Sequence, residues 1–136
     1  MPWPTEELKL RFNRPENADL LLYLEEYSPH VHSDLGMLLF DAAKKLPGVQ
    51  IFGPDIPACS YVFAHTSSGV AFVLAVGMRS LVLRLPEPYP ETRSFEKAGS
   101  GWHEFDPFDP QRDKGRNAAL VRELASAAFA HAESAA

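Results

Sequence analysis

The sequence predicts an α+β fold: an antiparallel β-meander of four to five strands, with two N-terminal helices and one C-terminal helix packed on it. Before Gly48, apolar residues recur at intervals of three and four, which is the spacing of a helix face. From Gly48 to Leu85 the period falls towards two, as in strands, and helical spacing returns after Pro110. Because the strands are consecutive and the helices lie at the two ends, we expect the helices on one face of the sheet.

Two helices are expected ahead of the strands. The first covers Asn17 to Tyr27, and its apolar face consists of Leu20, Tyr23, Leu24 and Tyr27. The second begins at Ser33, which we expect to cap it, while Asp34 favours the positive end of the helix. Its apolar stripe runs to Leu46, and Pro47-Gly48 ends it.

The strands follow in quick succession. We expect them at residues 49–52, 60–65, 70–76 and 80–85, with a further edge strand near 102–105. Thr66 to Gly69 reads as a turn, and the last three of the four main strands should form an antiparallel meander. Val70 to Val76 is apolar at every position, so this strand should be central and covered on both sides.

Asp109-Pro110 predicts the start of the last helix, which should run to about His131. Five of the 12 prolines fall between Pro86 and Pro110. Proline interrupts regular elements, so this acidic stretch, with its aromatic residues, is expected to be mainly a long loop. Long loops often carry function, which makes this one a candidate recognition surface.

Composition excludes several classes of protein. The 136 residues suit one domain, 1–136, and 46% hydrophobic with 23% charged residues argues against disorder. Eighteen acidic against 13 basic residues argue against a nucleic-acid partner. No apolar run approaches membrane-spanning length and no signal peptide is evident, so we expect a cytoplasmic protein with no membrane partner. The single cysteine, Cys59, excludes an internal disulfide and most simply packs at a strand start.

A metal site could be built from His30 and His32, with a third ligand from His65, His103 or Glu104. His30 and His32 lie in a linker before a helix, where exposed polar residues are ordinary. We therefore predict no metal ligand and no cofactor.

A hydrolase could use His103 beside Glu104, with Ser60 or Ser100 as nucleophile. Neighbouring residues of a strand point to opposite faces, however, so His103 and Glu104 would not orient one another. No Gly-x-Ser-x-Gly motif is present. We predict no catalytic residue.

The residues best suited to contact a ligand or partner are Arg84, Tyr89, Trp102, His103 and His65. We expect a small soluble binding module that recognises a protein partner or a small ligand. The sequence does not decide whether the chain forms a homodimer. One alternative is an immunity-type inhibitor of a basic toxin, which the acidic charge favours. Another is a small hydrolase or metal-dependent enzyme using His65, His103 and Glu104.

Three short motifs carry a resemblance: Ser67-Ser68-Gly69-Val70-Ala71-Phe72, Leu81-Val82-Leu83-Arg84-Leu85-Pro86 and Gly101-Trp102. In these motifs the chain resembles a small bacterial luciferase-associated family of unassigned function. The order of elements is also similar to TfoX N-terminal and MmcQ/YjbR-type domains, over roughly residues 60 to 130. The first family carries Phe-Ala-His on the strand before the arginine, where this chain has Phe72-Val73-Leu74. The resemblance implies the fold rather than an activity.

Overall fold

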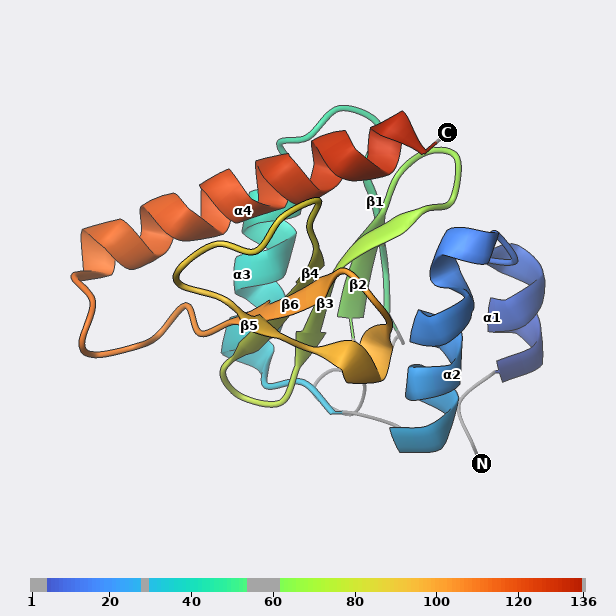
Figure 1. The fold of residues 1–136 in the computed structure, drawn as a ribbon, viewed down its shortest axis with the longest axis horizontal. Helices are drawn as coiled ribbons and strands as arrows, with labels where there is room; N and C mark the ends of the chain where they lie inside the picture. The colour runs from blue at the N-terminus through green and yellow to red at the C-terminus, as the bar shows by residue number, and fades with distance from the viewer. Residues whose placement is uncertain (1–4, 28–29, 54–61, 136) are drawn as a thin grey trace.

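The computed structural model describes residues 5–27, 30–53 and 62–135 (Figure 1). The helices are α1 (Thr5–Arg11), α2 (Ala18–Tyr27), α3 (Ser33–Ala43) and α4 (Lys114–Ser134), with short 3-10 turns η1 (Pro15–Asn17) and η2 (Glu96–Ala98). The strands are β1 (Gln50–Phe52), β2 (Val62–His65), β3 (Ala71–Val76), β4 (Ser80–Arg84), β5 (Arg93–Ser94) and β6 (Trp102–Phe105). Cys59 and Ser60 lie outside the described residues.

The described strands form one antiparallel sheet in the order β1-β2-β3-β4-β6-β5. This confirms the α+β class and the meander. The sheet has six strands rather than four or five, because Arg93 and Ser94 pair with Glu104 and His103. The strand at 102–105 is therefore not an edge strand: β5 lies outside it.

Helices cover both faces of the sheet, so the expectation that they share one face is wrong. α3 and α4 pack on one face, and the core there includes Phe72, Leu83 and Leu124. α1 and α2 cover the other face, where Leu20 and Trp102 are buried. Figure 1 shows the sheet between these two pairs of helices. The apolar run 70–76 is the cause, since both faces of β3 need cover, as its pattern predicts.

Both predicted helix caps are wrong. His32 rather than Ser33 caps α3, and its Nδ1 accepts a hydrogen bond from the backbone N–H of Asp34 at 3.1 Å. Asp113 caps α4 and accepts from the N–H of Arg116 at 3.2 Å. Asp109 instead forms a separate turn by accepting from the N–H of Gln111 at 2.9 Å, which delays the helix.

The predicted turn at Thr66 to Gly69 is confirmed. The N–H of Gly69 donates to the carbonyl of Thr66 at 3.0 Å, and Gly69 has φ of 91°. A residue with a side chain rarely adopts that backbone angle, so glycine suits this position. The hairpin closes next to η1, which brings the N-terminal helices onto the sheet.

Candidate functional site

Two cavities adjoin at the end of the sheet where β4 begins and β6 ends. The larger is a cleft of about 710 Å³ beside β5, and most of its lining residues are charged. It is lined by Arg79, Ser80, Pro90, Glu91, Thr92, Arg93, Glu104, Phe105, Asp106, Asp109 and Arg112. The lining of the cleft therefore comes from four parts of the chain. These are the start of β4, the segment that leads into β5, the end of β6 and the turns that lead into α4.

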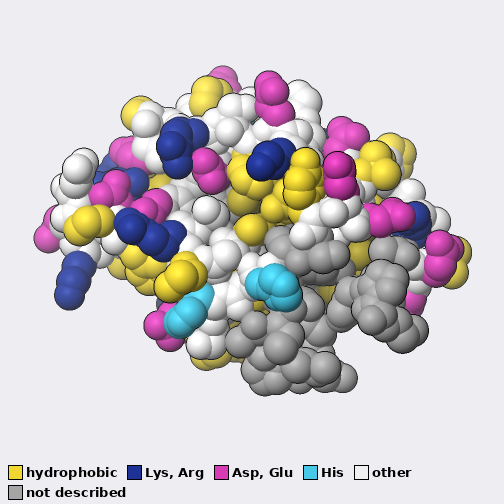
Figure 2. All heavy atoms as spheres, turned by 90° about the horizontal axis from the view of Figure 1, so that it is seen from below, with side chains coloured by type: hydrophobic (Ala, Val, Ile, Leu, Met, Phe, Trp, Pro, Cys, Tyr) yellow, Lys and Arg dark blue, Asp and Glu magenta, His cyan; other side chains and the backbone are white. Residues whose placement is uncertain are grey.

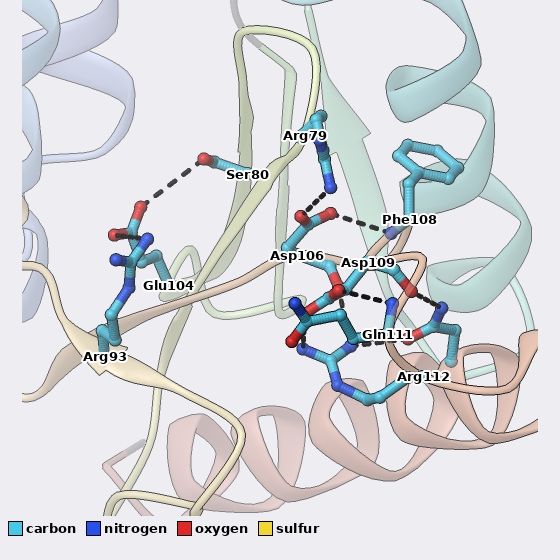
Figure 3. Close-up of polar contacts among 10 residues, drawn as sticks. Arg79, Ser80, Arg93, Glu104, Asp106, Phe108, Asp109, Gln111 and Arg112 are labelled. Atoms are coloured by element: carbon cyan, nitrogen blue, oxygen red, sulfur yellow. Dashed lines mark hydrogen bonds and ion pairs between the residues drawn. The ribbon is translucent and has the colours of Figure 1, made fainter.

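One wall of the cleft is built across three neighbouring strands. Arg93 on β5 lies with its Nη2 3.2 Å from Oε1 of Glu104 on β6, and the Oγ of Ser80 on β4 donates to Oε2 of the same carboxylate at 3.5 Å (Figure 3). The Arg93 side chain is 83% exposed, whereas that of Glu104 is 23% exposed. Exposed ion pairs contribute little free energy, about 0–1 kcal/mol, so Arg93 can leave Glu104 readily.

A second ion pair lies at the neighbouring end of the strands. The Nη2 of Arg79 is 2.5 Å from Oδ2 of Asp106, which follows β6 directly. The other oxygen of Asp106 accepts from the backbone N–H of Phe108 at 2.9 Å (Figure 3). The Asp106 carboxylate therefore joins the turn between β3 and β4, which contains Arg79, to the turn before α4.

Arg112 holds the wall that the two cavities share. Its Nη1 donates to the carbonyl of Asp106 at 2.8 Å and to Oδ1 of Asn117 at 2.5 Å, and its Nη2 lies 3.5 Å from Oδ2 of Asp109. The guanidinium also lies over the ring of Phe105, 4.6 Å from its centre. These contacts from three directions make this wall the fixed part of the site.

The second cavity, of about 460 Å³, lies between α3 and the start of α4. Its lining is mainly apolar and consists of Leu38, Pro107, Phe108, Pro110, Ala118 and Val121, together with Lys114 and Asn117. Asp109 and Arg112 line both cavities. A ligand that reaches across these two residues could place a polar group in the cleft and an apolar group in this cavity.

Trp102 and His65 lie in the interior. Trp102 is 2% exposed and packs in the core beneath α1 and α2. His65 is 4% exposed, its ring centre is 4.8 Å from that of Phe12, and its Nδ1 donates to the Thr66 carbonyl at 2.8 Å. Burial lowers the pKa of His65, although the bond to Thr66 opposes this effect.

His103 and Glu104 point to opposite faces. In the β4–β6 pairing, His103 lies opposite Leu83, on the face of α3 and α4, and Glu104 lies opposite Val82, on the other face. Burial lowers the pKa of His103. His65 packs against Phe12, so it is on the face away from His103. The structure does not bring His65, His103 and Glu104 together.

None of the remaining predicted residues lines the cleft. Tyr89 is partly buried against the core of α3 and α4, and Arg84 ends β4 at the strand end opposite Ser80. His32 is engaged as the α3 cap. Across residues 5–27, 30–53 and 62–135, no group of three or more His, Cys, Asp or Glu side chains is placed to hold a metal ion.

The acidic segment predicted as a recognition surface contains Arg93 and Asp106, and Arg112 follows it directly, but these residues were not among the five selected as contact residues, and sequence reasoning did not consider Arg79 as a site residue. The local signal was the spacing Asp106-Pro107-Phe108-Asp109-Pro110, in which each aspartate precedes a proline and starts a turn. Arg79 and Asp106 are 27 positions apart and have no such signal. Only the pairing of β4 with β6 brings them together.

Comparisons with known proteins return no match among protein-family models, curated proteins or solved structures. In the described part of the chain, no helix is both long enough and apolar enough to span a membrane. The function must therefore be argued from the site alone.

Proposed function

We propose that this chain is a protein-interaction module that takes an extended, basic segment of a partner protein across the two adjoining cavities. The observation that carries the proposal is that Asp109 and Arg112 line both the charged cleft and the apolar cavity. One segment can therefore place an apolar side chain between α3 and α4 and a charged side chain in the cleft. Protein–protein interfaces usually consist of apolar anchor residues surrounded by polar residues.

Charge supports a cationic segment. The cleft is lined by four carboxylates, Glu91, Glu104, Asp106 and Asp109, and the side chains of these residues are 23–31% exposed. Arg79 and Arg93 are more exposed, at 54% and 83%, so they can swing away while the carboxylates stay. A lysine or arginine of the partner would then replace Arg93 beside Glu104. The net charge of −5 would favour the approach of such a partner.

The surroundings of the cleft suit a peptide. β5 is the outermost described strand on its side of the sheet, and both of its residues are exposed. An extended segment can add to such an edge through backbone hydrogen bonds.

On the face drawn in Figure 2, acidic and basic side chains are interspersed, with hydrophobic side chains exposed among them. An immunity-type inhibitor of a basic toxin would be one narrower form of this function.

The test is site-specific photocrosslinking in the cells that make the protein. A photoreactive benzoylphenylalanine replaces Pro90 in the cleft or Ala118 in the apolar cavity; Gln50 on β1 and Ala130 on α4 are exposed control positions outside both cavities. The proposal predicts that the same protein is captured from Pro90 and Ala118 and not from the controls. Equal capture from the controls, or capture of a small molecule alone, would contradict it.

A further inference from the structure

The outer edge of β5 presents backbone groups to which no described strand is paired. Within the described residues β5 pairs only with β6, and Ser94 lies opposite His103 (Figure 1). The backbone N–H of Phe95 donates to the carbonyl of Trp102 at 2.8 Å. Backbone polar groups alternate in direction along an antiparallel strand, so those of Arg93 and Phe95 face β6 and those of Ser94 face outward. The N–H and C=O of Ser94, an exposed residue, are therefore placed to pair with a further strand.

A third, open cavity of about 610 Å³ continues the cleft along β5. It is lined by Ser94, Phe95, Glu96, Lys97 and Glu104. Glu104 also lines the cleft, so the two spaces adjoin at this carboxylate. Phe95 gives the cavity a half-buried aromatic wall, because its ring packs edge-on against that of Tyr23 on α2 with the ring centres 5.5 Å apart. An aromatic wall beside two carboxylates suits a side chain with an apolar stem and a cationic head.

The cations already near this cavity are exposed. The Nζ of Lys97 lies over the ring of Tyr27, 5.4 Å from its centre, and Lys97 is exposed. Arg93 pairs with Glu104, but its side chain is 83% exposed. Exposed contacts of this kind are weak, so a cation from a partner can replace either of them. Charge complementarity therefore favours a second basic residue in the bound segment, beside Glu96 and Glu104.

Strand geometry fixes the spacing between the two basic residues. Arg93 and Phe95 are two positions apart, so their side chains lie on the same face of β5, the face covered by α2. On a strand added to β5, the residues opposite these two are also two positions apart and point to this face. One would meet Glu104 in the cleft, and the other would lie in the third cavity beside Glu96.

We propose that the partner segment pairs with β5 as a further strand and carries two lysine or arginine residues separated by one residue. This inference rests on the proposed function, because it names the pattern of the same basic segment. The backbone of the segment bonds to the N–H and C=O of Ser94, while its two cations occupy the cleft and the third cavity. The residue between them points to the opposite face of the sheet.

The spacing is tested with a phage-displayed library of random short peptides, selected on the purified protein. We expect the enriched peptides to carry two basic residues separated by one residue. A synthetic copy of an enriched peptide should bind about 10-fold more weakly when either basic residue is replaced by alanine. In Glu96→Gln, one of these two replacements should lose most of its effect. Glu87→Gln, at an exposed position that lines none of the three cavities, is the matched control and should behave as the unchanged protein does.

The strand pairing is tested at the backbone of Ser94. Ser94→Pro removes the outward N–H, and proline is tolerated at an edge strand where the N–H faces solvent. We expect the synthetic peptide to bind Ser94→Pro about 10-fold more weakly, whereas Ser94→Ala, which keeps the N–H, should bind it as the unchanged protein does. N-methylation of the peptide at each position in turn gives the same test without changing the protein, and at least one methyl group should block binding.

The outcomes separate this inference from the proposed function. The inference would be overturned by enriched peptides that lack the paired basic residues. Equal binding by folded Ser94→Pro and Ser94→Ala, or binding that survives every N-methylation, would also overturn it. In these cases the proposed function would still stand on the capture of one partner from Pro90 and Ala118. If the library yields no peptide that binds, both the inference and the proposed function fail.

Discussion

The side-chain amide of Asn17 donates to the carbonyl of Gly69 at 2.7 Å, although the two residues are 52 positions apart. The same side chain donates to the Phe12 carbonyl at 3.2 Å and accepts from the N–H of Ala71 at 3.0 Å. Asn17 is fully buried, at 0% exposure. One asparagine therefore joins the end of α1, the start of α2 and the β2–β3 hairpin.

Asn17→Asp should destabilise the fold strongly. A carboxylate cannot donate, so the carbonyls of Phe12 and Gly69 would lose their partner and a charge would be buried beside them. Each buried group left without a partner costs about 1–3 kcal/mol, so we expect a loss of about 3 kcal/mol or more in the free energy of unfolding, measured by urea denaturation. Asn13→Asp, at an exposed position before η1, makes the same charge change and should cost under about 0.5 kcal/mol. Equal effects at the two positions would refute this role of Asn17.

Trp102→Ala should lower stability rather than act on a surface contact. The indole is 2% exposed in the core beneath α1 and α2, and truncation of a buried aromatic residue costs about 3–5 kcal/mol. Phe108, which is 42% exposed, is the matched control, and Phe108→Ala should cost under about 1 kcal/mol. Guanidinium denaturation of both variants measures this difference. A Trp102→Ala protein as stable as Phe108→Ala would show that the indole does not support the core.

Stability should fall as the pH falls below about 6.5, and His65 should contribute to the decrease. Burial lowers the pKa of His65 below its ordinary value of 6.5, so the unfolded chain takes up a proton first as the pH falls. The contribution of His65 to the free energy of unfolding therefore decreases from about pH 6.5 down to the folded-state pKa of His65. Below that pKa the contribution stays constant. Urea denaturation between pH 7.5 and pH 5 should show a shallower decrease for His65→Gln. His103 and His131, whose pKa values are also lowered by burial, should keep part of the slope. An unchanged slope in His65→Gln would contradict the assignment.

Arg112→Lys should loosen the wall between the two cavities. A lysine keeps the charge but cannot reach the Asp106 carbonyl, Asn117 and Asp109 together. We expect faster amide hydrogen exchange over residues 106–113 and a loss of about 1–2 kcal/mol. Arg116→Lys, at an arginine whose side chain is 52% exposed, should leave exchange in this segment unchanged. Slow exchange in Arg112→Lys would show that the wall does not depend on the guanidinium.

The sequence predicted the elements that have a clear hydrophobic period. α2, α3 and β2 to β4 fall where the apolar spacing placed them, because each buries a regular set of side chains. α1 was missed: Leu8 and Phe12 are buried but Leu10 is 77% exposed, and the helix is too short for a period to emerge. β5 has two exposed residues and no apolar pattern, and it is a strand only because β6 lies beside it.

The site was less predictable than the fold. Aromatic residues in the proline-rich segment pointed to a surface, but Trp102 and Phe105 are buried, whereas Phe108 is exposed and lines the apolar cavity. The cleft depends on pairs such as Arg79 with Asp106 and Arg93 with Glu104. These pairs arise from strand register, which a single sequence does not reveal. Arg84 was selected from the sequence, and the structure adds the observation that its buried Nη1 lacks an acceptor.

If one partner segment occupies both cavities, blocking one cavity should prevent crosslinking from the other. The photoreactive residue is placed at Pro90 in the cleft, and Ala118→Trp fills the apolar cavity on the far side of Asp109 and Arg112. We expect Ala118→Trp to remove capture of the partner from Pro90, whereas Ala130→Trp, an exposed position on the same helix, should leave it intact. Undiminished capture from Pro90 in the Ala118→Trp protein would show that the two cavities do not serve one ligand.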